Sequence, residues 1–536
     1  MAEKKTAYIN GRIFTSDREN LHADSMAAAG GRLTFVGSRA ELPNDDYDEV
    51  VDLKGKRVIP GFIDAHMHPV LLADFAKQIS CLPPKVNSIK ELSEAIAEVR
   101  KVQGPDKWIL GWGYDEGKLA EHRSPNRYDL DAGSADAPVY IIRSCEHIRC
   151  VNSKALEMAG ITKDTPDPQG GEIERDENGE PTGVLKENAK YLISPYLPEE
   201  TREDQIRNLV DLGDLLTSQG IVGICDMGNL TSDADNFDLY EEAVAEGFRQ
   251  KTAVYYMWDF FENDPEFFIP KYRMDSSRQI HAAGLKLIGD GSVSGRTAWV
   301  SEPYAGSTDE FGMPVYSDES MESALSFVKK NHCQLSVHAM GGRAIDRVID
   351  RLANEPEWME NGTPGIRMEH ITEPSDEALA KAARRGIAMA TQPIFSYCEI
   401  ETYLKNFGAE RTKKAYPYRK IMDAGIRLCL STDSPATSWA VPSDPFSNLK
   451  SAVTRIAYDG TDIGADQRLD METAVILYTA EAARVSGFDR SGMLKAGYSA
   501  DFAVLDRDIF DMEPSQIDQT RVECTVIAGE KAFAAE

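Results

Sequence analysis

A short apolar run ends in His-x-His within the stretch Pro60-Gly61-Phe62-Ile63-Asp64-Ala65-His66-Met67-His68-Pro69. Residues two apart on a β-strand point to the same face, so His66 and His68 could reach one metal ion from the carboxyl end of a strand. A neutral imidazole nitrogen is a common zinc ligand. The pair alone is a weak signal, because paired histidines also occur on surfaces and in hydrogen-bonded cores.

Four further apolar runs each carry a residue that could ligate a metal. They are 284–291 with Lys286, 334–339 with His338, 366–370 with His370, and 427–435 with Asp433. The segments between these runs have apolar residues at helical spacing, at 320–331, 342–354 and 375–385. Strands that alternate with helices predict a parallel sheet. In a closed (β/α)8 barrel all strand ends surround one mouth, so these polar residues can meet at one point.

The chain of 536 residues is much longer than a bare barrel of about 250 residues, so further domains are expected. Short alternating runs before residue 60 and after residue 487 predict strands, and chain ends often lie near one another. We therefore predict a small β-sandwich built from both chain ends. The predicted domains are 1–59 with 487–536 for the sandwich, 60–82 with 201–486 for the barrel, and 83–200 for an inserted lobe.

The segment 83–200 is too long for an ordinary barrel loop. A helical pattern at 89–102 is followed by apolar runs at 108–112 and 138–143, which predicts an α+β lobe. Such a lobe would cover the barrel mouth, shape the substrate pocket and exclude water.

The amino-acid composition limits which partners and which cellular compartment are expected for this protein. The formal charge of −29, from 88 acidic and 59 basic residues, argues against nucleic acid or an anionic membrane as a partner. The sequence contains no apolar run of about 20 residues, so no membrane-spanning helix is predicted. The eight cysteines form no CxxC pair, and no signal peptide is recognised, so we expect reduced thiols in a cytoplasmic protein. A homodimer is the default expectation for the oligomeric state, because two-fold dimers are the commonest soluble oligomers.

Five segments, in this order, make the sequence resemble the amidohydrolase superfamily over nearly its whole length. They are PGFIDAHMHP at 60–69, GLKLIGDGSVSGRTA at 284–298, SVHAMGGRAID at 336–346, RMEHI at 367–371 and LSTDSP at 430–435. Within the superfamily the sequence is most similar to the third family, the YtcJ-like branch that includes N-substituted formamide deformylases. The segments VNSKALEMAGI at 151–161 and GGEIERDENGEPTGVLKENA at 170–189 look like the insertion of that branch.

The resemblance implies a metal-dependent hydrolase with two zinc-type ions per chain. The ligands it implies are His66, His68 and Asp433 for one ion, His338 and His370 for the other, and Lys286 as an N-carboxylated bridge. An ammonium group has no acceptor atom, whereas carboxylation by CO2 creates an anionic ligand, and burial favours the neutral amine this needs. The alternative is that Lys286 reaches solvent or pairs with Asp290. The ligand set suits zinc, but manganese, iron, cobalt or nickel could also occupy it.

Asp433 is the expected catalytic residue. A metal can lower the pKa of its bound water to about 7, and the resemblance implies that this hydroxide attacks a carbonyl carbon. Asp433 would take the proton and carry it to the leaving nitrogen. The predicted reaction is hydrolysis of a non-peptide C–N bond in a small-molecule amide, N-substituted formamide or N-acyl compound. Alternatively, Asp433 only caps a turn at 432–435.

Two other functions stay open. A mononuclear deaminase of the same superfamily would release ammonia from an aromatic ring, but it needs no carboxylated lysine, so Lys286 argues against it. A non-catalytic regulatory relative could keep the fold without the chemistry, but all six ligand positions are filled by suitable residues.

Four residues are candidates for substrate contact: Trp112, Tyr114, His147 and Arg296. The two aromatic residues could instead pack in a core. Arg296 could bind a substrate carboxylate or pair with an acidic neighbour. The sequence departs from the family pattern at Cys145-Glu146, just before His147, and at Gly342, where relatives usually carry Asp. These departures put substrate and metal preference in doubt more than catalysis.

Overall fold

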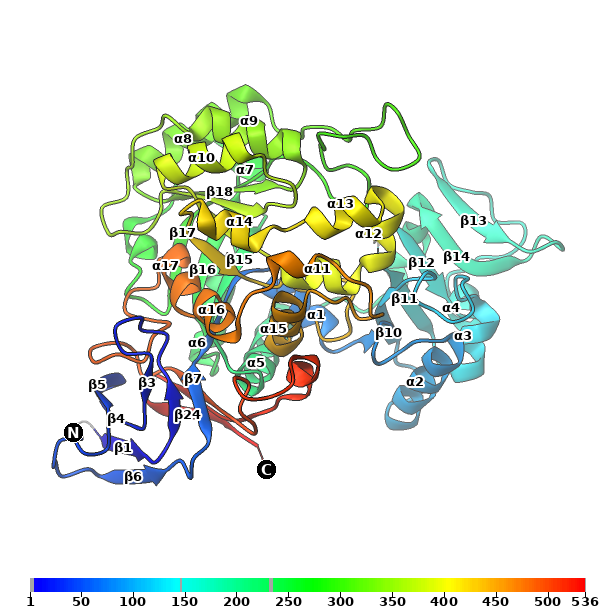
Figure 1. Ribbon diagram of the computed structural model, residues 1–536. Coiled ribbons are helices and arrows are strands. Elements are labelled where there is room, and N and C mark those ends of the chain that lie inside the picture. Colours follow the sequence, from blue (N-terminus) through cyan, green and yellow to red (C-terminus); the bar gives the residue numbers. More distant parts are fainter. Residues whose placement is uncertain (1–3, 145–146, 231–234, 536) are drawn as a thin grey trace. The chain divides into compact units, whose positions relative to one another are not determined.

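The computed structural model describes residues 4–144, 147–230 and 235–535. The chain forms two compact units (Figure 1). The larger unit consists of Met1–Pro69, Leu209–Thr437 and Ser443–Glu536, and the smaller of Val70–Asn208 and Ser438–Pro442. The domain boundaries expected at residues 60, 83, 201 and 487 remain predictions, as does the place of the lobe over the barrel mouth.

Eight parallel strands form the barrel, so the predicted (β/α)8 fold is confirmed. Strands β8 and β19 are buried along their whole length, as expected for strands covered on both faces. In pairing order the strands are β8 (Phe62–Met67), β15 (Ile221–Asn229), β16 (Lys251–Met257), β17 (Ile280–Ile288), β18 (Gln334–Ala339), β19 (Ile366–His370), β20 (Ala388–Thr391) and β21 (Leu428–Leu430).

Backbone hydrogen bonds join the first and last strands at their carboxyl ends. The N–H of Asp433, which follows β21, donates to the carbonyl of His66 in β8 at 2.7 Å. The N–H of His68 donates to the carbonyl of Ser434, also at 2.7 Å. The two ends of the sheet therefore meet where three of the predicted ligands lie.

Helices alternate with the barrel strands. The three helical patterns seen in the sequence correspond to α8 (Asp318–Asn331), α9 (Gly342–Leu352) and α10 (Asp376–Arg385), which lie together outside strand β18 (Figure 1). Ser317 and Ser375 cap α8 and α10 by accepting backbone N–H groups three residues on. The other helices of this unit include α6 (Asn236–Ala245), α7 (Trp258–Phe261), α11 (Pro393–Cys398), α12 (Ile400–Phe407), α13 (Ala409–Lys414), α14 (Tyr418–Asp423), α15 (Pro445–Thr454), α16 (Met471–Leu477) and α17 (Ala480–Ser486).

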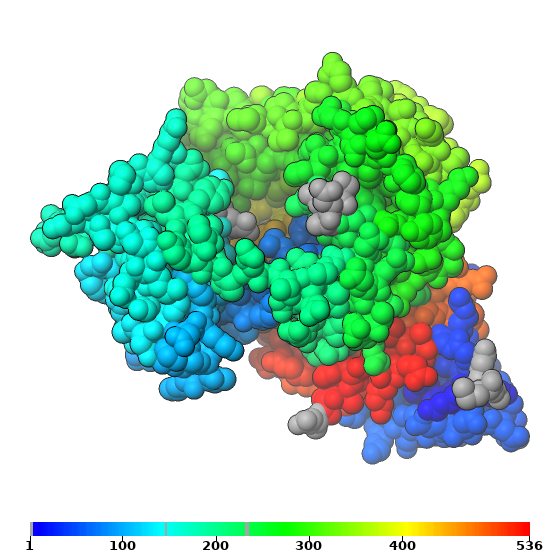
Figure 2. All heavy atoms as spheres, turned by 180° about the vertical axis from the view of Figure 1, so that it is seen from behind, coloured from blue at the N-terminus to red at the C-terminus, as the bar shows by residue number. Residues whose placement is uncertain are grey.

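The chain ends build the predicted β-sandwich. One sheet has the order β5 (Arg32–Gly37), β4 (Ser25–Ala29), β1 (Lys5–Ile9), β6 (Glu49–Asp52). The other has the order β24 (Glu530–Ala534), β23 (Val522–Ile527), β22 (Phe502–Leu505), β7 (Arg57–Pro60), β2 (Arg12–Phe14), β3 (His22–Ala23). Tyr8 and Phe502, one from each sheet, meet edge to face at 5.0 Å within a shared apolar core. Figure 2 shows the red C-terminal surface beside the blue N-terminal one.

The smaller unit has the predicted α+β character. Its sheet has the order β13 (Gly171–Arg175), β14 (Pro181–Glu187), β12 (Ile148–Val151), β11 (Val139–Arg143), β10 (Ile109–Tyr114), β9 (Ile79–Ser80). Helix α2 (Ile89–Val102) begins and ends as the sequence predicts and is capped by Ser88. Helix α1 (Pro69–Phe75) precedes α2 in the chain, and α3 (Arg127–Gly133) and α4 (Ser153–Met158) follow it. Helix α5 (Arg202–Ser218) comes next and precedes barrel strand β15.

Within the described residues, no helix is both long enough and apolar enough to cross a membrane. The seven described cysteines carry free thiols.

Candidate metal centre

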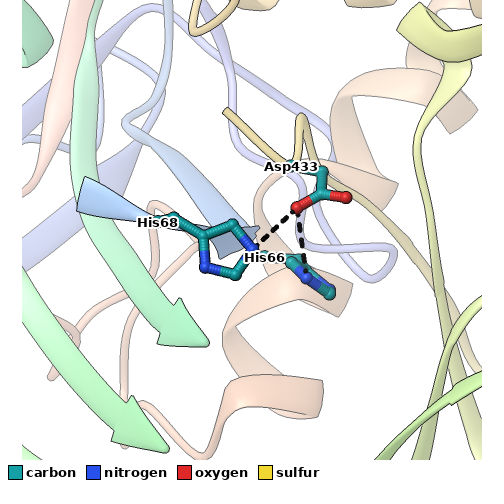
Figure 3. A group of neighbouring side chains, drawn as sticks. All are labelled: His66, His68 and Asp433. Atoms are coloured by element: carbon teal, nitrogen blue, oxygen red, sulfur yellow. Dashed lines mark ion pairs between the residues drawn. The ribbon is translucent and has the colours of Figure 1, made fainter. Parts of the chain in front are cut away.

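Three of the predicted ligands converge at the carboxyl end of β8 (Figure 3). The Oδ1 atom of Asp433 lies 3.1 Å from Nε2 of His68 and 3.3 Å from Nε2 of His66. One ligand atom from each residue lies within 4.8 Å of the other two. The two histidines come from the end of one strand and the aspartate from the loop after β21, so barrel closure is what assembles them.

The chemistry of this cluster fits a divalent cation. Oδ1 of Asp433 is buried and, within the described part of the chain, receives no hydrogen bond. A buried carboxylate oxygen of this kind needs a cation or a donor to offset its desolvation. Two imidazole nitrogens and one carboxylate oxygen are a donor set typical of zinc sites.

A buried carboxylate fixes the tautomer of His66. Nδ1 of His66 lies 2.7 Å from Oε2 of Glu369, and a carboxylate accepts, so Nδ1 carries the proton and Nε2 presents its lone pair. Burial, helped by the charge of Lys286, lowers the pKa of His66 to about 4. The ring is therefore neutral at pH 7, as a metal ligand must be.

The second pair of predicted ligands lies next to the first. The ring of His370 is 5.0 Å from that of His66 and 4.3 Å from that of His338, centroid to centroid. Nδ1 of His370 donates to Oε1 of Gln392 at 2.8 Å, and Nε2 of His338 donates to the carbonyl of Gly291 at 3.0 Å. Each ring thus has one nitrogen held as a donor and one left with a lone pair, the arrangement that hydrogen-bonded partners give to metal-bound histidines.

Lys286 points into this cluster. Its Nζ lies 3.2 Å from Nε2 of His66, and the residue is 2% exposed. The alternative of a solvent-directed side chain is therefore wrong. Asp290 has other partners, because it accepts the backbone N–H groups of Trp299, Met340 and Gly341. Burial lowers the pKa of Lys286 to about 8, which leaves a usable fraction of neutral amine near neutral pH.

Asp433 is held in its ionised form. Burial alone would raise its pKa, but the neighbouring His66 and His68 outweigh burial and hold the pKa of Asp433 below its usual range. The backbone of Asp433 has a φ of 59°, and that of His370 has a φ of 76°. Left-handed backbone at non-glycine residues costs free energy and clusters at functional sites. Two of the six predicted ligands are held in this conformation.

Sequence reasoning missed several polar residues that hold the predicted ligands. Arg367 and Glu369 lie two apart on β19, both fully buried, and Glu369 contacts His66. The signal was present in the RMEH motif, since two charges at period 2 inside an apolar strand must share a face. Asp64 was also missed. It accepts the N–H and hydroxyl of Thr432 at 3.1 and 2.6 Å, and so ties the loop of Asp433 to β8.

Three of the four candidates for substrate contact lie in the smaller unit, two of them buried and one exposed. Trp112 is buried and stacks on Phe75 at 5.1 Å. Tyr114 is completely buried in the apolar core of the lobe. Both aromatic residues therefore show the core packing that was the alternative for them. His147 is exposed and lies 2.9 Å from Glu187 through Nδ1, and the neighbouring departure Cys145-Glu146 lies outside the described residues. A substrate role for these three residues remains a prediction.

The remaining candidate and the remaining departure lie in the barrel unit. Arg296 makes two hydrogen bonds to the carboxylate of Glu310, at 2.8 and 2.6 Å, which was the alternative expected for it. At Gly342, a Cβ atom would come within 2.4 Å of Oγ of Ser301. A side chain at position 342 would therefore require Ser301 to move.

Comparison with known proteins agrees with this geometry. The sequence matches the Amidohydrolase family over residues 49–533. It is 28% identical over 545 residues to the putative amidohydrolase YtcJ of Bacillus subtilis (strain 168), covering 99% of each chain. It is 28% identical over 535 residues to the N-substituted formamide deformylase of Arthrobacter pascens, covering 97% of each chain.

Among solved structures, an uncharacterized metal-dependent hydrolase from Pyrococcus horikoshii OT3 is similar, with a TM-score of 0.71 and 27% identity. The match covers 95% of this chain and 99% of that one. The resemblance first seen in the sequence motifs is confirmed. Because the family match spans most of its length, the chain belongs to the amidohydrolase family of metal-dependent hydrolases.

Proposed function

We propose that the protein hydrolyses a non-peptide C–N bond in a small molecule, such as a linear amide, an N-substituted formamide or an N-acyl compound. The observation that carries the proposal is the convergence of His66, His68, Asp433 and Lys286 at one end of the barrel. The relative named N-substituted formamide deformylase supports this choice of bond.

We propose two divalent ions per chain, zinc by the type of ligand. His66, His68 and Asp433 would hold one ion, His338 and His370 the other, and Lys286 would lie between them. When bound, such ions lower the pKa of water and polarise a substrate carbonyl. Asp433 would accept a proton from the attacking water and donate it to the leaving nitrogen.

Lys286 would become a ligand by reacting with CO2. The lone pair of neutral Nζ forms a bond to the carbon of CO2, one C=O π pair moves onto oxygen, and one amine proton leaves to solvent. The product is an anionic carbamate with two acceptor oxygens in place of a donor-only ammonium. The burial of Lys286, the 3.2 Å contact with His66 and the lowered pKa of its amine support this step.

The test is metal content per chain by elemental analysis, on protein purified with zinc and bicarbonate. Wild type should hold close to two ions and Lys286→Ala one or fewer. Lys251→Ala is the matched control, because Lys251 lies at the amino end of β16 and hydrogen-bonds Ser491. The control should retain the wild-type content. One ion held equally by wild type and Lys286→Ala would refute the bridging role and favour a mononuclear deaminase.

Activity is tested separately with panels of formamides, N-acyl compounds and ring amines. Release of carboxylate or formate from the first two classes is the expected result, and it should disappear with Asp433→Asn. Release of ammonia from ring amines alone would identify the deaminase instead. A metal-loaded wild type that turns over none of the three panels would leave the non-catalytic, regulatory alternative as the better account.

A further inference from the structure

A buried ion pair lies inside the barrel next to the candidate metal centre. Arg367 and Glu369 both have side chains that are 0% exposed. Nε of Arg367 lies 2.6 Å from Oε1 of Glu369, and one terminal nitrogen lies 3.1 Å from Oε2. Taking two charges out of water costs several kcal/mol per ion, so the presence of a buried ion pair at this position requires an explanation.

The pair has partners on several strands. Arg367 also donates to the carbonyl of Ala65 on β8 at 2.7 Å, and its other terminal nitrogen lies 3.3 Å from the hydroxyl of Tyr255 on β16. Glu369 accepts from the hydroxyl of Ser336 on β18 at 2.8 Å and from Nδ1 of His66 at 2.7 Å. Both carboxylate oxygens of Glu369 therefore have donors, and one of these donors belongs to a proposed metal ligand.

Buried ion pairs in general give no strong reason to attribute this pair to fold stability. Buried ion pairs replaced by apolar residues of similar size often leave stability unchanged or higher. The surrounding barrel core is apolar and includes Ala65, Cys225, Ala253 and Cys429. The group whose chemistry depends on the pair is His66, because an acceptor at Nδ1 leaves the Nε2 lone pair directed toward Asp433 and Lys286.

We infer that Glu369, held by Arg367, is a positioning residue that fixes the tautomer and the ring orientation of His66. Arg367 orients the Glu369 carboxylate by donating to both of its oxygens, at 2.6 and 3.1 Å. This inference rests on the metal site of the proposed function. It adds that site's supporting residues and does not depend on which substrate is used.

Two double variants separate positioning from packing. Arg367→Met with Glu369→Leu removes both charges and the acceptor at Nδ1 of His66. Arg367→Met with Glu369→Gln also removes both charges but keeps an amide oxygen that can accept from Nδ1. Tyr255→Phe is the control, because it disturbs the same interior through Arg367 and Gln334 without touching His66.

The measurements are the zinc dissociation constant from chelator competition, the visible absorption of the cobalt-substituted protein, and the melting temperature without metal. The Leu double variant should bind zinc about 10- to 100-fold more weakly, with a changed cobalt spectrum and a melting temperature near or above that of wild type. The Gln double variant should bind zinc about 10-fold more tightly than the Leu double variant. Tyr255→Phe should keep the affinity and the spectrum of wild type.

Two results would overturn the inference. One is unchanged zinc affinity in the Leu double variant, and the other is an equal loss in the Leu variant, the Gln variant and Tyr255→Phe, which would mean general loosening of the interior. Should the Leu double variant fail to fold, Arg367→Met with Glu369→Met removes the same acceptor with a flexible apolar side chain, and its cobalt spectrum, compared with that of Tyr255→Phe, decides the matter. A wild type that binds no zinc or cobalt at all would instead refute the proposed metal site, so the two failures are distinguishable.

Discussion

Acid should destabilise this protein through His281, which lies near the start of β17, far along that strand from Lys286. His281 is 2% exposed, and its Nδ1 is buried without a hydrogen-bond partner in the described part of the chain. Its ring meets Phe488 edge to face at 5.5 Å. A neutral ring is accommodated there, whereas an imidazolium would be a buried charge whose desolvation the charge of Asp275 does not outweigh. Burial accordingly lowers the pKa of His281 from 6.5 to about 4.

The sign and the size of the effect follow from linkage. Below pH 6.5 the unfolded chain binds a proton at His281 that the folded chain does not, so stability falls as the pH drops and the loss is complete near pH 4. At about 1.4 kcal/mol per pH unit, the loss reaches about 3 kcal/mol. With an unfolding entropy of about 2.1 cal/mol/K per residue and roughly 400 residues in the larger unit, this corresponds to about 4 °C in melting temperature.

The assay compares wild type with His281→Phe, which keeps an aromatic ring against Phe488 but cannot titrate. Melting temperatures are measured from pH 7.5 to pH 4 by differential scanning calorimetry, with a chelator present so that both proteins are free of metal. Other groups titrate in both proteins and cancel in the difference. Between pH 6.5 and pH 4 the melting temperature of wild type should fall by about 4 °C more than that of His281→Phe. A difference that stays constant to within about 1 °C across this range would refute the reasoning.

Three other substitutions test the site and its surroundings. Gly341→Ala should destabilise the fold by about 1–3 kcal/mol, measured by thermal melting, because a Cβ there would lie 2.3 Å from the backbone of Trp299. Asp433→Asn should lose metal in elemental analysis and reduce turnover by about 100-fold or more, since it would remove both a proposed ligand and the proposed proton carrier. Arg296→Met should change stability by less than about 1 kcal/mol and leave turnover of uncharged amides unaltered, because its guanidinium pairs with Glu310 near the surface.

The barrel and the clustering of the predicted ligands could be predicted from the sequence because each predicted ligand lies in or just after an apolar run. Strand period and the shared direction of parallel strands then bring the ends of those runs to one mouth. The outer helices were predictable for a similar reason, since α8, α9 and α10 have apolar residues at helical spacing. In these elements a single pattern decides both the local structure and the buried face.

For the residues that were missed or misplaced, the local pattern does not decide what surrounds the side chain. Arg367 and Glu369 alternate along β19, so the sequence shows that they share a face. It does not show which strand faces them across the barrel. Tyr114 was a candidate for substrate contact because glycines flank it, yet it ends strand β10 and lies in the lobe core. Glycine indicates backbone freedom or close approach, but it does not tell whether the neighbouring side chain points toward solvent or into a core.

The contacts that close the barrel also assemble the candidate metal centre in this chain. The hydrogen bonds between His66 and Asp433 and between His68 and Ser434 join β8 to the loop after β21. The same four residues include all three members of the His-His-Asp cluster. A ligand that binds only the folded state stabilises that state by mass action, so metal at this cluster should hold the two edge strands together. Chelation should therefore increase amide hydrogen exchange at β8 and β21 more than at β16, a strand of the ring that carries none of the proposed ligands.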